Sequence, residues 1–122
     1  MNKTPSIEKV TERIYALDPS LHERYGEKGK NKCRTDNQHH LDHLQTAFEL
    51  ENSKVFTDYT LWLNGILQKY GMKTQTLLDN FMVLKEELDL LSDLPDRQKE
   101  MYRSYLTEAI DILEHEKAKE EE

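Results

Sequence analysis

Three of the five histidines of this 122-residue chain lie within nine residues, DNQHHLDHL, which run from Asp36 to Leu44. Imidazole nitrogens bind divalent metals and haem iron, and they exchange protons near neutral pH. The two aspartates of the stretch add carboxylate oxygens, which can ligate a cation or accept a hydrogen bond from an imidazole. The stretch is therefore the first candidate for a metal, cofactor or ligand site.

A helix through this stretch separates the three histidines. At about 100° per residue, His40 lies within about 30° of the centre of the apolar positions of a helix over residues 30–50. His43 lies about 90° from that centre and His39 about 130° from it, on the solvent side. The three imidazoles therefore do not converge on one ion.

Because the three histidines point in different directions, two weaker cofactor hypotheses are left. His39 and His43 are four residues apart, and such a pair can chelate a divalent metal on an exposed helix. Zinc needs four ligands, or three and a water molecule, and no other cysteine or histidine has motif spacing. His40 alone could serve as an axial haem ligand. We expect no cofactor, and keep a haem or metal protein as the alternative.

His40 on an apolar stripe needs a hydrogen-bond partner, because burial of an unpaired polar group costs free energy. Asp36 lies one turn before it and could orient the ring. Two interpretations stay open: a core histidine with its hydrogen bonds satisfied, or a residue that lines an internal pocket.

The remaining reactive side chains favour an ordinary core. Cys33 is the single cysteine, so the chain forms no internal disulfide, and on the buried stripe it is best interpreted as an inert thiol. Four aromatic residues could line a half-wet cavity or simply pack, namely Tyr59, Trp62, Tyr102 and Tyr105. Neither a Ser/His/Asp arrangement nor a buried carboxylate pair can be argued, so we expect no enzyme.

The elements that carry these residues are helices. Only four glycines and three prolines interrupt the chain, and apolar residues recur at helical spacing with no sustained period of two. The sequence predicts an all-α protein, a compact bundle of five to six helices, with a globin-like arrangement as one option.

The boundaries of these helices are marked by residues that start or stop a helix. In chain order they are Thr4-Pro5, Asp18-Pro19, Gly26 with Gly29, Ser53, Gly71, Thr74 and Pro95. We expect one domain over residues 1–115 and a charged, frayed tail over residues 116–122.

The clearest amphipathic pattern lies in residues 55–70. Large apolar residues occupy eight positions of a helical face: Val55, Phe56, Tyr59, Trp62, Leu63, Ile66, Leu67 and Tyr70. This is more apolar surface than a thin bundle hides, so we expect the chain to form a homodimer.

Charge and hydropathy restrict the partners. The net charge is −7, and the positive excess is confined to residues 1–35, which hold eight Lys and Arg against five Asp and Glu. An acidic body argues against binding to nucleic-acid phosphates. The chain lacks an apolar run of membrane-spanning length and a signal-peptide pattern, so we expect a cytoplasmic protein without membrane association.

The runs KCRTDNQHHLDHLQTAF and VFTDYTLWLNGILQKYGM resemble a helical module of bacterial regulatory and corrinoid-binding proteins, which often precedes a cobalamin-binding domain. The resemblance covers about residues 30–91 and rests on Lys32, Cys33, Asp36, His40, Leu41, Leu44 and Ala47, on Phe56, Asp58, Tyr59 and Trp62, and on Gly71. The chain departs from the pattern at Met72-Lys73, where relatives carry an aliphatic residue and proline. Haem-free, globin-like sensor domains of bacilli are a second analogy, at the level of the fold.

The resemblance implies a regulatory or sensory domain that acts through a protein partner or a small apolar ligand. It does not imply cobalamin, because the Asp-x-His-x-x-Gly motif of the corrinoid-binding domain is missing. The matched positions include His40 and Asp36 but neither His39 nor His43. We therefore expect Asp36, His40, Tyr59 and Trp62 to form one polar-aromatic cluster, either as a structural contact or as the lining of a pocket.

Overall fold

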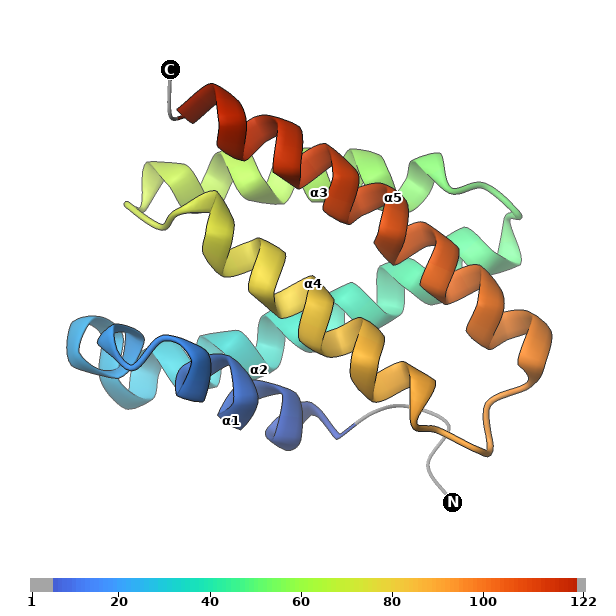
Figure 1. Ribbon diagram of the computed structural model, residues 1–122, viewed down its shortest axis with the longest axis horizontal. Helices are drawn as coiled ribbons and strands as arrows, with labels where there is room; N and C mark the ends of the chain where they lie inside the picture. The colour runs from blue at the N-terminus through green and yellow to red at the C-terminus, as the bar shows by residue number, and fades with distance from the viewer. Residues whose placement is uncertain (1–5, 121–122) are drawn as a thin grey trace.

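The computed structural model describes residues 6–120 as five α-helices (Figure 1). They are α1 (Ile7–Leu17), α2 (Ser20–Glu49), α3 (Lys54–Lys69), α4 (Thr74–Asp89) and α5 (Asp96–Glu120). The described range contains no β-strand, so the predicted all-α bundle is confirmed.

Helix α4 lies in the middle of the bundle, with α5 on one side and α1 on the other (Figure 1). Helix α2 packs against α1 near its beginning and against α3 and α5 further along. Among the described residues no Cα atom of α2 lies within 8 Å of one of α4. Side chains alone must therefore bridge these two helices.

One connected apolar core holds the helices together. Its largest fully buried side chains include Phe56 of α3, Phe81 of α4 and Leu44 of α2. His40 is buried among them, as the helical-wheel argument predicts.

Gly26 and Gly29, which were both expected to end a helix, have different backbone conformations. Gly26 has φ +59° and kinks α2, so the expected break between two helices appears as a kink inside one long element. Gly29 is helical, and a Cβ atom there would lie 2.4 Å from Tyr25 Cβ and 2.7 Å from Tyr15 Oη. Gly29 thus permits a close approach of two tyrosines and does not end a helix.

The start signals are only partly those expected. Thr4 and Pro5 lie outside the described residues, and Ser6 caps α1 by accepting from Lys9 N at 3.2 Å. Ser53 occupies the N-cap position of α3 without a side-chain cap bond. The N-cap of α4 is Lys73, so the prediction that Thr74 caps this helix is wrong by one residue.

The stop signal at Gly71 is confirmed. Gly71 has φ +82°, and Met72 N donates to Leu67 O at 3.0 Å, which satisfies a carbonyl of the last turn of α3. A residue with a side chain in this left-handed conformation would be strained.

The predicted fraying from residue 116 is wrong for residues 116–120, since α5 continues to Glu120. The Glu120 carboxylate accepts hydrogen bonds from Gln68 and Thr74, and Lys119 pairs with Glu116 at 3.0 Å. The bonds of Glu120 attach the end of α5 to α3 and α4, which the charged composition of the segment does not reveal.

The predicted apolar face of α3 is rotated in the structure. Phe56, Tyr59, Leu63 and Leu67 are buried, whereas Trp62 is 63% exposed. The buried arc is shifted toward the polar side, where Thr60 and Asn64 are also buried. Thr60 tolerates burial because its hydroxyl donates to Phe56 O at 2.8 Å.

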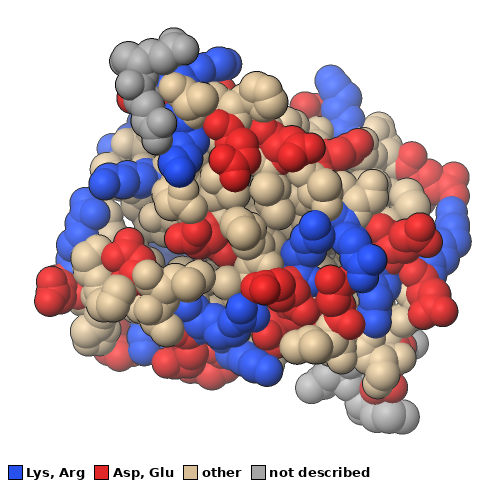
Figure 2. Space-filling model, in the orientation of Figure 1, with Lys and Arg blue, Asp and Glu red and all other residues tan. Residues whose placement is uncertain are grey.

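The face shown in Figure 2 carries acidic and basic side chains interspersed, not one basic patch. Within residues 6–120, no helix combines the length and the apolar composition that a membrane span requires.

Candidate functional site

His40 lies at the centre of a buried hydrogen-bond chain that joins three helices. Its Nδ1 atom is 2.7 Å from the Tyr59 hydroxyl on α3, and its Nε2 atom is 3.3 Å from Asn80 Oδ1 on α4. The Asn80 carbonyl oxygen can only accept, so Nε2 carries the proton and Nδ1 accepts from Tyr59. The two bonds together select one tautomer of a neutral imidazole.

Asn37 and Asn80 continue the chain as a reciprocal amide pair across the space between α2 and α4. Asn80 Nδ2 donates to Asn37 Oδ1 at 2.7 Å, and Asn37 Nδ2 donates to Asn80 Oδ1 at 3.2 Å. Asn37 Nδ2 also donates to Cys33 O at 2.9 Å. This pair supplies the bridge between two helices whose backbones stay apart.

Neither asparagine is among the site residues predicted from the sequence. A signal was present, because Asn37 is three residues before His40 on the same face of α2. Asn80 likewise follows Leu77 by three residues on the buried face of α4. A buried amide on each of two helices suggests a mutual pairing, but nothing in the sequence matches the two across 43 residues.

Burial keeps this chain of groups uncharged. Desolvation lowers the pKa of His40 to about 3, because the imidazolium form would lose its hydration. Desolvation also raises the pKa of the Tyr59 hydroxyl. Both side chains are therefore neutral at neutral pH.

The aromatic neighbours fix the His40 ring from two sides. The ring makes edge contacts with Phe81, with centroids 5.0 Å apart, and with Tyr59, at 5.8 Å. On the outer side of Tyr59, the His43 ring stacks at 3.8 Å. Tyr59 thus contacts both the buried imidazole and a half-exposed one.

The expected cluster is therefore assembled differently from the prediction. His40 and Tyr59 meet, but Asp36 pairs with Lys32 at 3.1 Å and Asn80 takes the place expected for Asp36. Trp62 does not enter the core, and its ring centroid lies 6.3 Å from that of Tyr59. The predicted inward position of Trp62 is wrong because the buried arc of α3 is rotated away from it.

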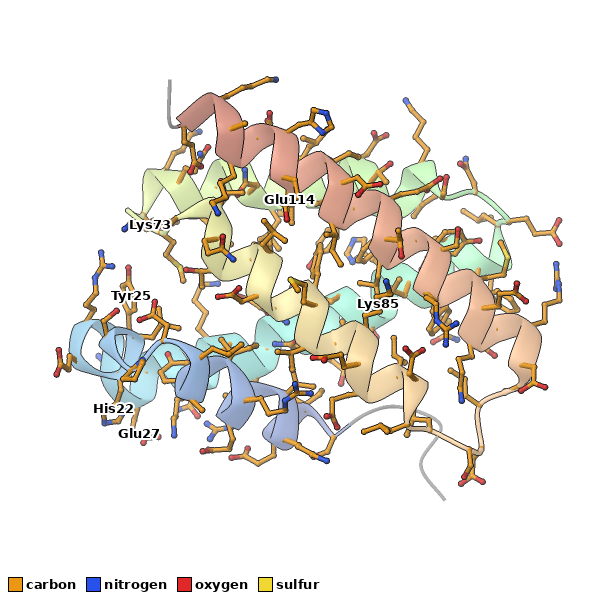
Figure 3. The ribbon with its side chains drawn as sticks, in the orientation of Figure 1. His22, Tyr25, Glu27, Lys73, Lys85 and Glu114 are labelled. Carbon is orange, nitrogen blue, oxygen red and sulfur yellow. The ribbon has the colours of Figure 1, made fainter. Side chains whose placement is uncertain are left out.

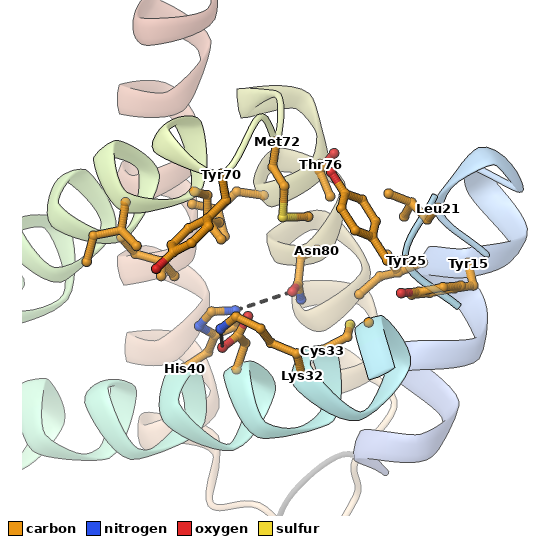
Figure 4. Close-up of a pocket in the computed structure, with 17 residues that line it drawn as sticks. Tyr15, Leu21, Tyr25, Lys32, Cys33, His40, Tyr70, Met72, Thr76 and Asn80 are labelled. Carbon is orange, nitrogen blue, oxygen red and sulfur yellow. Dashed lines mark hydrogen bonds and ion pairs between the residues drawn. The ribbon is translucent and has the colours of Figure 1, made fainter. Parts of the chain in front are cut away.

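A pocket of about 550 Å³ lies against this hydrogen-bond chain (Figure 4). Its walls come from α1, residues 21–40 of α2, the second half of α3 with the loop that follows it, and the beginning of α4. Its volume falls in the usual range for small-molecule sites. The lining side chains are Ile14, Tyr15, Leu21, Tyr25, Lys32, Cys33, Asp36, His40, Leu63, Ile66, Leu67, Tyr70, Met72, Thr76, Leu77 and Asn80, with Gly29.

The kink at Gly26 places one wall of the pocket. Tyr25 projects from the kinked end of α2 toward the loop that carries Lys73, whereas His22 and Glu27 point away from it (Figure 3). On the opposite side Tyr70 lines the pocket while its side chain is largely exposed, so it marks the rim.

The pocket contains few reactive groups. Desolvation raises the pKa of the Cys33 thiol to about 11, which agrees with the expected inert cysteine. Lys32 and Asp36 neutralise each other as an ion pair. The lining is therefore mainly apolar. Its uncharged polar part, the floor of the pocket, consists of His40 and Asn80 together with Asn37 and Tyr59, which are hydrogen-bonded to them.

The donor set does not fit the metal and haem alternatives. Both ring nitrogens of His40 are engaged, so neither offers a free lone pair to haem iron. His43 Nδ1 donates to His39 O at 2.8 Å, which leaves its Nε2 lone pair free, so the case against a metal at His39 and His43 rests on the number of ligands. Within residues 6–120 no group of three or more His, Cys, Asp or Glu side chains is placed to hold a metal ion.

Comparisons of the chain with protein-family models, with curated proteins and with solved structures found no match. The resemblance to the helical module of regulatory and corrinoid-binding proteins therefore stays a prediction.

Proposed function

We propose that this chain is a non-enzymatic regulatory or sensory domain that binds a small, largely apolar molecule in the pocket beside His40. The observation that carries the proposal is the pocket itself, about 550 Å³ in volume, with apolar walls and an uncharged polar floor. Such a combination binds the ligand body through burial of apolar surface and orients it through a few polar groups.

Binding is favoured over catalysis by the state of the polar groups. A general base needs an available lone pair, but His40 Nδ1 already accepts from Tyr59 and Nε2 is protonated. A cysteine nucleophile needs thiolate character, and burial keeps the Cys33 thiol protonated. These groups are suited to holding a molecule in place.

The regulatory part of the proposal rests on Tyr59 and on the resemblance. The Tyr59 hydroxyl donates a hydrogen bond to His40 in the floor of the pocket. The Tyr59 ring also stacks on the His43 ring at the surface between α2 and α3. A ligand that shifts His40 would therefore change the packing of a surface that a protein partner can contact. We place the domain in the cytoplasm, where its single cysteine stays reduced.

Binding of the uncharged fluorescent probe N-phenyl-naphthylamine tests the proposal. We expect saturable fluorescence enhancement with one probe per chain, and we expect Ile66→Trp to abolish it, because the larger side chain fills the pocket. Leu61→Trp is the matched control, since it places the same indole on α3 at an exposed position that does not line the pocket. Failure of the chain to bind, or equal binding by both variants, would show that the pocket is not a ligand site.

A further inference from the structure

The floor of the pocket has almost no hydrogen-bonding capacity left. Asn80 Oδ1 accepts from Asn37 Nδ2 and from His40 Nε2, which occupies both of its lone pairs. The two N–H groups of Asn37 are directed at Asn80 Oδ1 and Cys33 O. Both ring nitrogens of His40 are bonded as well.

One donor is left. The Asn80 amide nitrogen carries two hydrogens, and the described residues provide it with one acceptor, Asn37 Oδ1 at 2.7 Å. Asn80 lines the pocket, and Figure 4 shows its amide on the pocket side of α4, between Met72 and His40. The second N–H is therefore available to a molecule in the pocket.

This count restricts the polar end of a ligand. A carbonyl oxygen only accepts, so it can pair with the second N–H and leave nothing unsatisfied. A hydroxyl could accept as well, but its own O–H would find the lone pairs of the pocket-lining His40 and Asn80 already occupied. An unmade buried hydrogen bond is costly, so the carbonyl suits this end of the pocket better.

The charges of the lining exclude an ionised end. The floor groups are neutral, and the lining cation, Lys32, is paired with Asp36 at 3.1 Å. A carboxylate or an ammonium group would lose its hydration without gaining a counter-ion.

We propose that the ligand is an uncharged, mainly apolar molecule whose buried end is a carbonyl group, a ketone or an ester, which accepts a hydrogen bond from Asn80 Nδ2. This inference rests on the proposed function, because it requires the pocket to bind a ligand.

The test uses three probes of ten carbons, methyl octyl ketone, decane and decanoate, each displacing N-phenyl-naphthylamine. We compare the unmodified chain with Asn80→Asp, an isosteric variant that removes the N–H donors and keeps an acceptor for His40. We expect ketone affinity to fall about threefold to tenfold or more, the amount that one hydrogen bond contributes, and decane affinity to change much less. Thr76→Val is the matched control, because it removes a different polar group of the pocket, the Thr76 hydroxyl, and should leave the ratio of ketone to decane affinity unchanged.

A second measurement needs no variant. In the unmodified chain, the side-chain amide resonance of Asn80 should shift downfield in ¹H–¹⁵N spectra on addition of the ketone but not of decane. This measurement decides the question if Asn80→Asp does not fold.

The outcomes separate the two proposals. Equal effects of Asn80→Asp on ketone and decane, an Asn80 amide resonance unmoved by the ketone, or decanoate as the tightest probe would overturn the carbonyl assignment and leave the pocket as a ligand site. Failure of the ketone, decane and N-phenyl-naphthylamine all to bind would overturn the proposed function and this inference with it.

Discussion

At the scale of single residues, the site depends on one neutral histidine whose two nitrogens have different roles. Tyr59 donates to Nδ1 and Asn80 accepts from Nε2, so the ring orientation and its tautomer are determined together. Each partner comes from a different helix, and loss of either leaves a buried atom without a hydrogen bond.

Tyr59→Phe should destabilise the fold by about 1–3 kcal/mol, because His40 Nδ1 becomes an unsatisfied buried acceptor. The free energy of unfolding, measured by urea denaturation, checks this value. Tyr70→Phe is the control, since Tyr70 is 73% exposed, and it should change stability by less than about 0.5 kcal/mol. Equal effects of the two substitutions would show that the Tyr59–His40 bond contributes nothing.

The His40 imidazole should also make stability depend on pH. Its folded pKa of about 3 lies below the ordinary value of 6.5, so between these values the unfolded chain binds more protons. Stability is therefore full above about pH 6.5 and falls as the pH is lowered toward 3, by at most about 1.4 kcal/mol per pH unit.

Urea denaturation at pH 7 and pH 5 measures this dependence. In His40→Gln the difference in unfolding free energy between the two pH values should shrink, because the titrating group is gone. His39→Gln removes an exposed histidine and should keep the difference of the unmodified chain. A pH dependence that is the same in all three proteins would contradict the assignment to His40.

At the scale of the elements, α2 and α3 shape the pocket through deviations from a regular amphipathic helix. Gly26 kinks α2 and thereby turns Tyr25 toward α4, while Gly29 leaves room for the Tyr25 side chain and for the Tyr15 hydroxyl of α1. In α3 the buried arc is rotated toward Thr60 and Asn64, which leaves Trp62 at the surface. The two glycines therefore set the positions of the pocket-lining tyrosines, and the rotation of α3 decides which of its side chains join the core.

Gly29→Ala should destabilise the protein by about 1–3 kcal/mol, because the new methyl group would overlap Tyr25 Cβ and Tyr15 Oη. It should also weaken binding of N-phenyl-naphthylamine, since both tyrosines line the pocket. Gly65→Ala in α3 is the control: nothing lies within 4 Å of the added atom, so it should stabilise the helix by about 0.4–1 kcal/mol. Thermal unfolding of the two variants distinguishes them, and a stabilised Gly29→Ala would disprove the close approach.

At the scale of the whole molecule, α3 presents apolar surface that the bundle does not cover. Leu61 is 42% exposed and Trp62 63% exposed, and they are neighbours on the outer face of this helix. The homodimer expected from the apolar content of residues 55–70 therefore stays a prediction, with this face as its candidate interface.

Sedimentation-velocity measurements over a range of protein concentrations test the homodimer. We expect a concentration-dependent dimer that Trp62→Glu dissociates, because a carboxylate in the interface would be buried without a partner. Leu90→Glu is the control, since Leu90 is 71% exposed and lies at the C-cap of α4, not on α3. A chain that is monomeric at every concentration would exclude self-association.

The sequence by itself determined the properties that repeat along one helix. The helical period places His40 inward and His39 outward, and Gly71 ends α3 because its left-handed conformation favours glycine. Both predictions depend only on residues that are close in the sequence. The regular geometry of a single helix is therefore enough to make them.

The tertiary structure alone decided which groups meet. Asn80 pairs with Asn37 across 43 residues, Trp62 is excluded because α3 is rotated against its neighbours, and the pocket exists because α2 and α4 stay apart. A helical wheel gives the direction of a side chain about one axis but carries no information on the distance and rotation between axes. Those quantities follow from the packing of all five helices at once, and they determine both the partners of His40 and the space beside it.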